Sequence, residues 1–328
     1  MIANPLVSTI VVSYNHFRFV LDTLESVKAQ TYNPTQVIIV DDCSTDESVA
    51  TIEQWLHDNG MHCTFIRHQN NQGLCKSLND ALAVANGKYL SMTAADDIWL
   101  PDKIARQVEI MESQPDHVGM LYSDAFQIDE HGRPLPDMFI EAHAKLPEMP
   151  QGQVLSALLE RNFIPAMTTL IRRSCYEQVG LYDENLPWED WDMWMRIARQ
   201  YSVVYSPTPS AKYRIHAESY SHIQPERMLK NSFQVCFKQL RLGNLSEDHR
   251  STLIVTLLSF AMQLYRRNDP DASHILLDLW HATGDTRAVW MYWFARLNVS
   301  FRIFERANGC RRRLRSLVGN LAASMTTA

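Results

Sequence analysis

The sequence lacks the features that mark several large classes of protein. Its six cysteines are scattered and form no C-x-x-C pair, which argues against a zinc knuckle or a thioredoxin-type motif. The longest apolar stretch, residues 253–265, is shorter than the roughly 20 residues that a membrane-spanning helix requires. Basic residues are not in surplus, because the formal net charge is −6, and this argues against a general nucleic-acid binder.

The beginning of the chain shows no targeting signal. Residues 1–5 carry no basic side chain and precede only a short apolar run, so we expect no secretory signal. A reducing cytoplasm is then the simplest compartment, with the cysteines as small apolar fillers. The 328 residues, 46% hydrophobic and 21% charged, are typical of a globular protein of about two domains.

The first hundred residues alternate short apolar strands with amphipathic helices. Strands are predicted at residues 7–13, 37–40, 63–67 and 88–93. Helices are predicted at 17–30, from a capping box at 44–47, at 73–86 before a left-handed Gly87 cap, and from Pro101. Continuous apolar strands between helices indicate a doubly wound, mostly parallel sheet that is covered on both faces.

The pattern changes along the rest of the chain. Further strands are predicted at 119–123, 168–172 and 203–205, and the proline-rich stretch 134–150 is predicted to be a loop. From about residue 225 onward the pattern is helical almost throughout. We therefore expect an α/β region that is followed by an all-helical one.

Two pairs of carboxylates follow predicted strands. Asp41 and Asp42 follow the second strand, and Asp96 and Asp97 follow the fourth. In such sheets ligands bind beyond the carboxyl ends of the strands. Because neighbouring residues of an extended chain point opposite ways, one member of each pair can face a ligand while the other secures the loop. A carboxylate accepts from a base N–H or binds Mg²⁺ or Mn²⁺, and turn or helix-cap roles are the alternative.

Seven motifs occur in an order that resembles one known family. They are residues 7–15 (VSTIVVSYN), 40–46 (VDDCSTD), 70–73 (NNQG), 87–89 (GKY), 95–103 (ADDIWLPDK), 188–196 (WEDWDMWMR) and 213–216 (YRIH). Together they resemble the family-2 glycosyltransferases of GT-A fold, over roughly residues 5–221. The resemblance implies a Rossmann-like nucleotide-sugar-binding domain with a mixed sheet at 1–224. Its nucleotide-binding half would be about 1–115, its acceptor half about 116–224, and a helical region would follow at 225–328.

The resemblance also implies a metal-dependent transfer. The family's D-x-D motif falls on Ala94, Ala95 and Asp96, so its first acid is missing. We expect Asp96 to hold Mn²⁺ or Mg²⁺ near the nucleotide, where the cation would stabilise a departing diphosphate. His216 either completes the metal or phosphate site or is a structural histidine. Asp97 either orients the donor sugar or holds its loop.

Three further side chains are candidates for binding the nucleotide. Asp42 maps onto the family's uracil contact, and Tyr14 could stack on the base through its ring face. Lys76, one turn into a predicted helix, could approach phosphate together with the positive end of that helix. The alternatives are a helix-cap aspartate, a buried tyrosine and an exposed lysine.

Asp190 is the candidate base. An inverting transfer needs one carboxylate behind the anomeric carbon, to take the proton of the acceptor hydroxyl. Glu189 and the rings of Trp188 and Trp191 are expected beside the donor or acceptor sugar, with at least one tryptophan of this helix face in the core. The alternative for these acids is ordinary helix-start acidity, which Asp192 could represent.

The C-terminal region is rich in arginine. Seven arginines oppose a single acid, Glu305, between residues 296 and 315. A partly apolar stripe and a preceding aromatic cluster predict adsorption of residues 290–321 to an anionic membrane surface. Packing on the catalytic domain or on a second subunit of a homo-oligomer is the alternative.

The expected protein is therefore an inverting glycosyltransferase of hexosyl- or N-acetylhexosaminyltransferase type. It would move a sugar from a nucleotide-sugar, expected to be a UDP-sugar, to a hydroxyl of a saccharide or lipid-linked saccharide in polysaccharide or glycolipid synthesis. A nucleotidylyltransferase would need a glycine-rich phosphate loop, and residues 13–16 contain no glycine. A catalytically degenerate sugar-nucleotide-binding module is the alternative that Ala94 leaves open.

Overall fold

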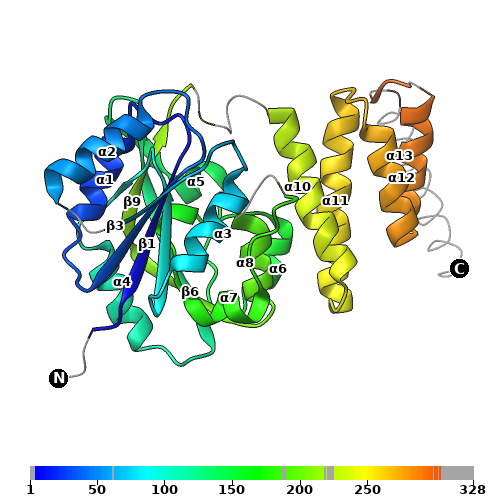
Figure 1. The fold of residues 1–328 in the computed structure, drawn as a ribbon. Helices are drawn as coiled ribbons and strands as arrows, with labels where there is room; N and C mark the ends of the chain where they lie inside the picture. Colours follow the sequence, from blue (N-terminus) through cyan, green and yellow to red (C-terminus); the bar gives the residue numbers. More distant parts are fainter. Residues whose placement is uncertain are drawn as a thin grey trace, which may run out of the picture. The chain divides into compact units, whose positions relative to one another are not determined.

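The computed structural model describes residues 4–60, 63–186, 190–217, 219, 225–297, 299–301 and 303. The chain divides into two compact units, Met1–Ile223 and Gln224–Ala328. The first is an α/β unit, and the second contains only helices among its described residues (Figure 1).

Four parallel strands form one part of the sheet in the first unit. β1 (Val7–Ser13) pairs with β2 (Thr35–Asp41) and β4 (Tyr89–Ala94), and β2 pairs with β3 (Cys63–Arg67). Every residue of β1 is buried, as expected for a central strand with helices on both faces. Since parallel strands end at the same edge, the loops that follow β1, β2 and β4 begin side by side.

The helices between these strands lie on opposite faces of the sheet. α1 (Val20–Lys28) and α2 (Ser48–Asn59) lie on one face and α3 (Leu74–Val84) on the other (Figure 1). The strand order β3-β2-β1-β4 reverses direction at β1. Such a reversal is the point at which open α/β sheets bind their ligands.

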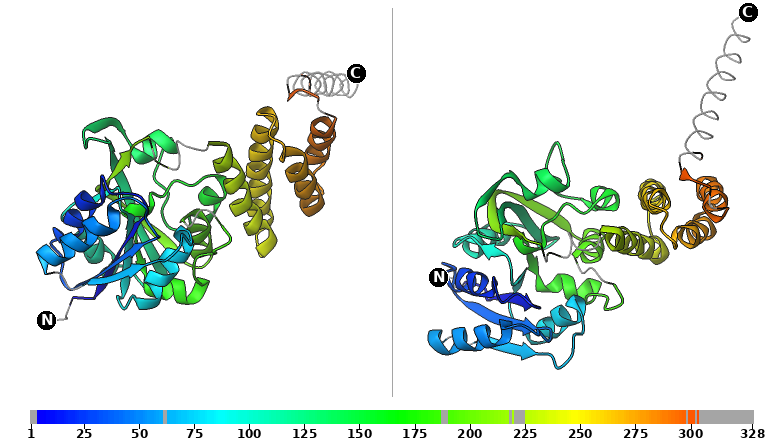
Figure 2. Two further views of the ribbon diagram at one scale, coloured as in Figure 1. Left: turned by 45° about the horizontal axis from the view of Figure 1, so that its top comes forward. Right: turned by 90° about the horizontal axis from the view of Figure 1, so that it is seen from above.

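The other part of the sheet is mixed. β8 (Leu170–Arg172) pairs antiparallel with β4 on one side and with β6 (Val118–Asp129) on the other. β6 also pairs parallel with β9 (Ser202–Ile215) and antiparallel with β7 (Pro134–Met138). β9 pairs antiparallel with the short strand β5 (Ile98–Trp99). Figure 2 shows β6 and β9 side by side. The expected α/β fold with a mixed sheet is confirmed, whereas a mostly parallel sheet holds only for the first four strands.

Five more α-helices and one short 3₁₀ helix complete the described part of the first unit. They are α4 (Lys103–Glu112), α5 (Phe139–His143), α6 (Leu155–Glu160), the 3₁₀ helix Ala166–Thr168, α7 (Arg173–Val179) and α8 (Asp190–Ala198). The predicted loop at 134–150 is wrong, because β7 and α5 lie within it. The predicted helix start at Pro101 is also wrong, because α4 begins at Lys103.

The predicted capping box at 44–47 is wrong because its hydroxyl has another partner. Ser44 Oγ donates to Asp41 Oδ2 (2.6 Å) and accepts from the backbone N–H of Asn15 (2.9 Å). α2 begins instead at Ser48, whose N–H donates to Asp46 Oδ1 (2.9 Å). Ser44 therefore links two strand-end loops rather than capping a helix.

The predicted cap at Gly87 is wrong as well. α3 ends at Val84, and Ala85 is already extended. A Cβ at Gly87 would lie 2.5 Å from the backbone nitrogen of Ser8, closer than real side chains come. The glycine therefore permits close approach of the chain to β1 rather than a left-handed turn.

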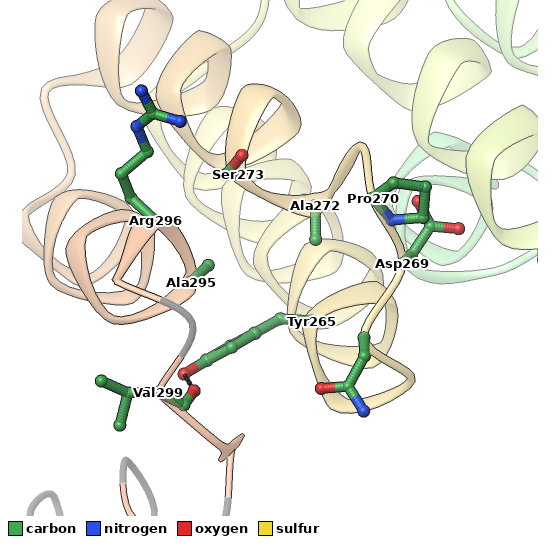
Figure 3. A pocket seen from close by; sticks show the side chains of 9 residues that line it. Tyr265, Asp269, Pro270, Ala272, Ser273, Ala295, Arg296 and Val299 are labelled. Atoms are coloured by element: carbon green, nitrogen blue, oxygen red, sulfur yellow. Dashed lines mark hydrogen bonds between the residues drawn. The ribbon is translucent and has the colours of Figure 1, made fainter.

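The second unit is helical in its described residues, as predicted. It contains α10 (Pro225–Leu242), α11 (Glu247–Arg266), α12 (Ala272–Thr283) and α13 (Thr286–Arg296). No helix in the described ranges is both long enough and apolar enough to cross a membrane. A pocket of about 250 Å³ is lined by residues from the ends of α11, α12 and α13, and the Tyr265 hydroxyl donates to the carbonyl of Val299 beside it (Figure 3).

Candidate active site

Side chains from three separate loops meet at one carboxylate oxygen of Asp96. The Nε2 atom of His216, which follows β9, lies 3.1 Å from Asp96 Oδ2. The Nε2 atom of His16, which follows β1, lies 3.8 Å from the same oxygen. The side chains of Asp96, His216 and His16 are 15%, 3% and 21% exposed. The group thus lies where the sheet order reverses, in contact with solvent but mostly buried.

The backbone around His16 is held by the neighbouring strand-end loop. Asn15 adopts a left-handed conformation, with φ of 56°, and its Oδ1 accepts from the N–H of Thr45 (2.8 Å). The N–H of His16 itself donates to Ser48 Oγ (2.9 Å), and its carbonyl accepts from the first turn of α1. The loops after β1 and β2 therefore fix the position from which the imidazole reaches Asp96.

Arg214 holds the Asp96–Asp97 turn through its side chain and its backbone. Its Nε donates to the carbonyl of Asp96 (2.9 Å), and its backbone N–H donates to Asp97 Oδ1 (2.9 Å). The guanidinium is 2% exposed, lies over the ring of Phe19 and donates to Asp22 (2.9 Å). Asp97 is buried, and its observed contact holds the loop, which is the second of the two roles expected for it.

The two adjacent carboxylates have opposite pKa shifts. Burial disfavours the charged form of Asp96, but its hydrogen bond with His216 and its attraction to both histidines outweigh this and lower its pKa. Burial, and next the negative charge of Asp96, raise the pKa of Asp97 well above its usual range. Negative charge is therefore concentrated on Asp96, the residue that faces the histidines.

Asp42 is buried among backbone donors. Its carboxylate accepts from the N–H groups of Gln72 and Gly73 (2.8 Å each) and is 2.8 Å from His68 Nδ1. Its neighbour Asp41 accepts from the N–H and hydroxyl of Ser44. Both members of this pair therefore secure loops, although one of them was expected to face a ligand. The contact of Asp42 with a base stays a prediction.

Lys76 is paired within its own helix, and its approach to phosphate stays a prediction. Lys76 Nζ donates to Asp80, one turn further along α3. Asp80 also lies 3.1 Å from His68 Nε2, so the lysine ends a chain of polar side chains that starts at Asp42. The Asp42 carboxylate already occupies the N-terminal end of α3, where a phosphate would otherwise bind.

Tyr14 is open to solvent. Its side chain follows β1 directly and is 43% exposed, so the alternative of a buried tyrosine is excluded. An exposed ring at the strand-end edge can present one face to a planar ligand.

Asp190 begins α8 in a polar setting of its own. Its Oδ2 accepts from Asn162 Nδ2 (2.9 Å), and its Oδ1 accepts from the N–H of Trp191 (2.5 Å). Burial raises its pKa, although these two hydrogen bonds oppose the shift. Asp96 and His216 contact each other, but in the described part of the chain no hydrogen bond joins Asp190 to either of them.

The chain before α8 is attached to α3. Asn79 Nδ2 donates to the carbonyl of Tyr182 (3.0 Å), and Cys75 Sγ lies 3.3 Å from the carbonyl of Leu186. These contacts hold residues 182–186, which precede Asp190 in the chain, against α3.

Trp191 is a core residue. It is 5% exposed, and its indole N–H donates to the carbonyl of Leu158 (2.8 Å). The expected sugar contact through its ring is therefore wrong, because neither face is open. Trp188 and Glu189 lie outside the described residues.

Two important residues of this site were not predicted from the sequence, namely the side chains of His16 and Arg214. His16 directly follows the motif residues 13–15 at a strand end, so the rule that selected Asp96 could have selected it too. Arg214 lies inside the quoted 213–216 motif, but its bonds to Asp96, Asp97 and Asp22 join residues far apart in sequence.

Comparison with known proteins decides the family. Residues 8–180 match the family described as Glycosyl transferase family 2. The chain belongs to this family.

The chain is similar to two bacterial proteins, among other members of the family. An uncharacterized glycosyltransferase of Rickettsia felis is 30% identical over 233 residues, which cover 71% of this chain and 37% of that relative. The putative teichuronic acid biosynthesis glycosyltransferase TuaG of Bacillus subtilis is 29% identical over 219 residues, covering 66% of this chain and 82% of the relative. The chain thus spans just over a third of the length of the Rickettsia felis relative.

Solved structures share the fold. S. aureus TarS 1-349 in complex with UDP-GlcNAc superimposes with a TM-score of 0.63 and 18% identity, over 89% of this chain and 88% of that one. The mannosyltransferase PcManGT from Pyrobaculum calidifontis, in complex with GDP-Man and Mn²⁺, gives 0.61 and 20%, over 92% and 84%. At these identities the likeness concerns the fold alone.

The residues at Asp96 fit two positions of a divalent-cation site. Two ligand atoms at a right angle, each about 2.1 Å from a cation, lie about 3 Å apart, and Asp96 Oδ2 and His216 Nε2 are 3.1 Å apart. His216 Nδ1 is buried with no hydrogen-bond partner among the described residues, and Nε2 faces the Asp96 carboxylate, so a cation would take the place of the proton between Nε2 and Oδ2. Within the described ranges no three His, Cys, Asp or Glu side chains form a ready-made metal site, so a cation would need other ligands such as phosphate oxygens and water.

Asn162→Ala is expected to move the acid limb of the transfer rate to higher pH. With Asp190 as the expected base, which acts only when ionised, the rate would fall as pH drops through the pKa of Asp190, and burial raises that pKa. The Asn162 hydrogen bond lowers that pKa, and removing it raises the pKa further. The pH dependence of kcat for both proteins tests this, and an unchanged acid limb would contradict it.

Proposed function

We propose that this glycosyltransferase transfers a sugar with inversion from a nucleotide-sugar, of UDP type, to a hydroxyl of a saccharide or lipid-linked saccharide. The observation that carries the proposal is the convergence of Asp96, His216 and His16 at the reversal point of the sheet. Support comes from the family match and from structural neighbours whose titles name UDP-GlcNAc and GDP-Man. Polysaccharide or glycolipid synthesis is the proposed setting, in line with the name of TuaG.

Asp96 and His216 would hold the divalent cation, Mn²⁺ or Mg²⁺. When bound, the cation supplies Lewis-acid neutralisation of the charge that develops on the departing diphosphate. The lowered pKa of Asp96 keeps its carboxylate ionised for this role across the neutral range.

Asp190 would act as the base of the reaction. The acceptor hydroxyl gives its proton to Asp190, its oxygen bonds to the anomeric carbon, and the bond to the diphosphate oxygen breaks with its electron pair on the diphosphate. Asn162 and the N–H of Trp191 would hold the carboxylate in orientation for this transfer.

Tyr14 and Asp42 would recognise the nucleobase of the donor. The exposed ring of Tyr14 offers a stacking face. Asp42 accepts three hydrogen bonds, and a carboxylate can accept about four, so one acceptor position is left for a base N–H.

A panel of UDP- and GDP-sugars incubated with the full chain and Mn²⁺ tests the proposal. Release of the nucleoside diphosphate from one donor, reduced by EDTA, is the expected result. A second candidate is a degenerate module that binds sugar nucleotides without turnover, and Ala94 in place of the first acid favours it. Donor binding without release from any member of the panel would support that module and overturn the transferase.

We also propose peripheral association with the cytoplasmic face of a membrane through residues 290–321, of which the structure describes only part. The side chains of Trp290 and Trp293 on α13, and of Leu297 just after its end, recur at helical spacing and are 52%, 54% and 70% exposed. Tryptophans suit the boundary between headgroups and acyl chains, and the arginines that follow in sequence suit anionic headgroups.

Replacing five of these arginines with glutamine is expected to release the protein from anionic liposomes. The changed positions are Arg306, Arg311, Arg312, Arg313 and Arg315. Each arginine near the surface contributes about 1 kcal/mol, so the partition coefficient is expected to fall by at least about 100-fold. Sedimentation with anionic and with neutral vesicles measures this, and an unchanged bound fraction favours packing within the protein or a homo-oligomer, which gel filtration would show.

A further inference from the structure

His68 is a buried histidine at the strand-end edge of the sheet that the proposed reaction does not use. It follows β3, as Asp42 follows β2 and Tyr14 follows β1, and these three strands are neighbours in the sheet. The N–H of His68 donates to the carbonyl of Asp41 (3.0 Å), and the N–H of Asp42 donates to the carbonyl of Ser13 (2.9 Å). The three strand-end loops are therefore joined in a row, with the Asp42 loop in the middle.

The His68 side chain lies between two carboxylates. Its Nδ1 is 2.8 Å from Asp42 Oδ1, its Nε2 is 3.1 Å from Asp80 Oδ2, and the side chain is 5% exposed. An ionised carboxylate only accepts hydrogen bonds, so the imidazole must be the donor. The contact with Asp42 is the shorter one, and Asp80 has a second donor in Lys76. The Nδ1 proton of His68 is therefore directed at Asp42.

This proton limits the number of acceptor positions that Asp42 has left. Each carboxylate oxygen offers about two such positions. Oδ1 accepts from His68 Nδ1 and from the N–H of Gln72, so both of its positions are taken. Among the described residues Oδ2 accepts from the N–H of Gly73 alone, so one position remains on it. Asp42 can thus accept one N–H group from a base and has no place for a second.

We propose that His68 sets the base preference of the donor site by limiting Asp42 to bases that offer a single N–H group. This inference rests on the base contact of Asp42 in the proposed function. Uracil offers one N–H between two carbonyl groups. Guanine offers two neighbouring donors, its ring N–H and its amino group, which suit a carboxylate with a free position on each oxygen.

The cost to guanine comes from its second donor. Beside Asp42 that donor meets Oδ1, which already accepts two hydrogen bonds. A buried donor without an acceptor loses its hydrogen bonds to water and gains none in return, which weakens binding. The site therefore prefers uridine nucleotides to guanosine nucleotides, and His68 is the side chain that creates the difference.

Two purine nucleotides that differ only in the amino group test this inference. Inosine diphosphate has the ring N–H of GDP but lacks its amino group, so it presents one donor. Calorimetry with the full chain and Mn²⁺ gives Kd for inosine diphosphate, GDP and UDP. The unaltered protein is expected to bind inosine diphosphate about 10-fold more tightly than GDP. In His68→Leu, which frees a position on Oδ1, the two purine nucleotides are expected to bind about equally.

Two control variants keep the donor or leave the site alone. His68→Asn places an amide nitrogen about where Nδ1 lies and is expected to keep the preference of the unaltered protein. His57→Leu changes a histidine on α2 that is 84% exposed and should also keep it. Thermal melting checks that the variants fold, and the purine ratio of the unaltered protein needs no variant. A ratio near one in the unaltered protein would overturn the inference.

The same titrations separate His68 from the proposed function. If His68 only supported the fold, His68→Leu would weaken both purine nucleotides equally. That result, with UDP bound by the unaltered protein, would overturn the role of His68 and leave a UDP-type donor standing. Tighter binding of GDP than of UDP by the unaltered protein, or no binding of any of the three nucleotides, would overturn both.

Discussion

Asp190→Asn is expected to lower the rate of sugar transfer by about 10²- to 10⁴-fold, the range typical for loss of a general base. The amide keeps the size of the side chain and can still contact Asn162, but it cannot take a proton from the acceptor hydroxyl. Donor affinity should stay nearly unchanged, because Asp190 has no hydrogen bond to the described residues at Asp96. The measurement is kcat for transfer, together with Kd for the nucleotide-sugar by calorimetry.

Asp192→Asn is the matched control on the same helix. Asp192 is 2% exposed and pairs with Arg196 Nε at 2.9 Å, so its loss affects the stability of α8 rather than the reaction. Measured well below its melting temperature, this variant should keep kcat within a few-fold of the unaltered protein. Equal activity of Asp190→Asn and the unaltered protein would remove Asp190 from its role and leave helix-start acidity as the explanation.

Arg214→Ala is expected to lower the free energy of unfolding by about 2–4 kcal/mol, as the loss of buried charged hydrogen bonds and packing does. The guanidinium is 2% exposed and donates to the Asp96 carbonyl, which would lose a buried partner. Its ion pair with Asp22 adds little to this figure, because the Asp22 side chain is 58% exposed. The cavity left against Phe19 adds to the loss.

The Arg214→Ala change should also disturb the candidate site at Asp96. Arg214 supports the turn that carries Asp96, so Mn²⁺ binding at the proposed cation site is expected to weaken along with stability. Urea unfolding measures the first effect, and Arg133→Ala is the surface control, since Arg133 is 74% exposed and should cost less than about 0.5 kcal/mol. Equal urea midpoints for the Arg214 and Arg133 variants would show that Arg214 does not brace the turn.

Much of the fold is predictable from local pattern. The strands at 7–13 and 63–67 match the structure to the residue, because a short apolar run between helices has few other ways to be buried. Helix ends are less predictable. Ser44 has the sequence of a cap, yet Asp41 and Asn15 take its hydroxyl, and no local rule weighs a distant partner against a nearby one.

The candidate site shows the same division. Asp96 and His216 are 120 residues apart, and the motifs that contain them predict one shared site, which the 3.1 Å contact supports. Asp42, Lys76 and Trp191 also lie in or beside quoted motifs, yet the structure turns the first toward backbone N–H groups, pairs the second with Asp80 and buries the third. A motif places a residue on a particular strand, helix or loop, but it does not determine what the side chain of that residue contacts.

By itself the sequence determined the family, the order of strands and helices, and the edge of the sheet at which polar side chains gather. These follow from hydrophobic period and from the position of each residue along one strand, which are local properties. Only the tertiary structure decided that His16 joins Asp96 and His216, and that Arg214 holds the Asp96–Asp97 turn. Such contacts depend on which donors from distant loops lie within hydrogen-bond distance of a given oxygen. The packing of the chain in three dimensions sets those distances.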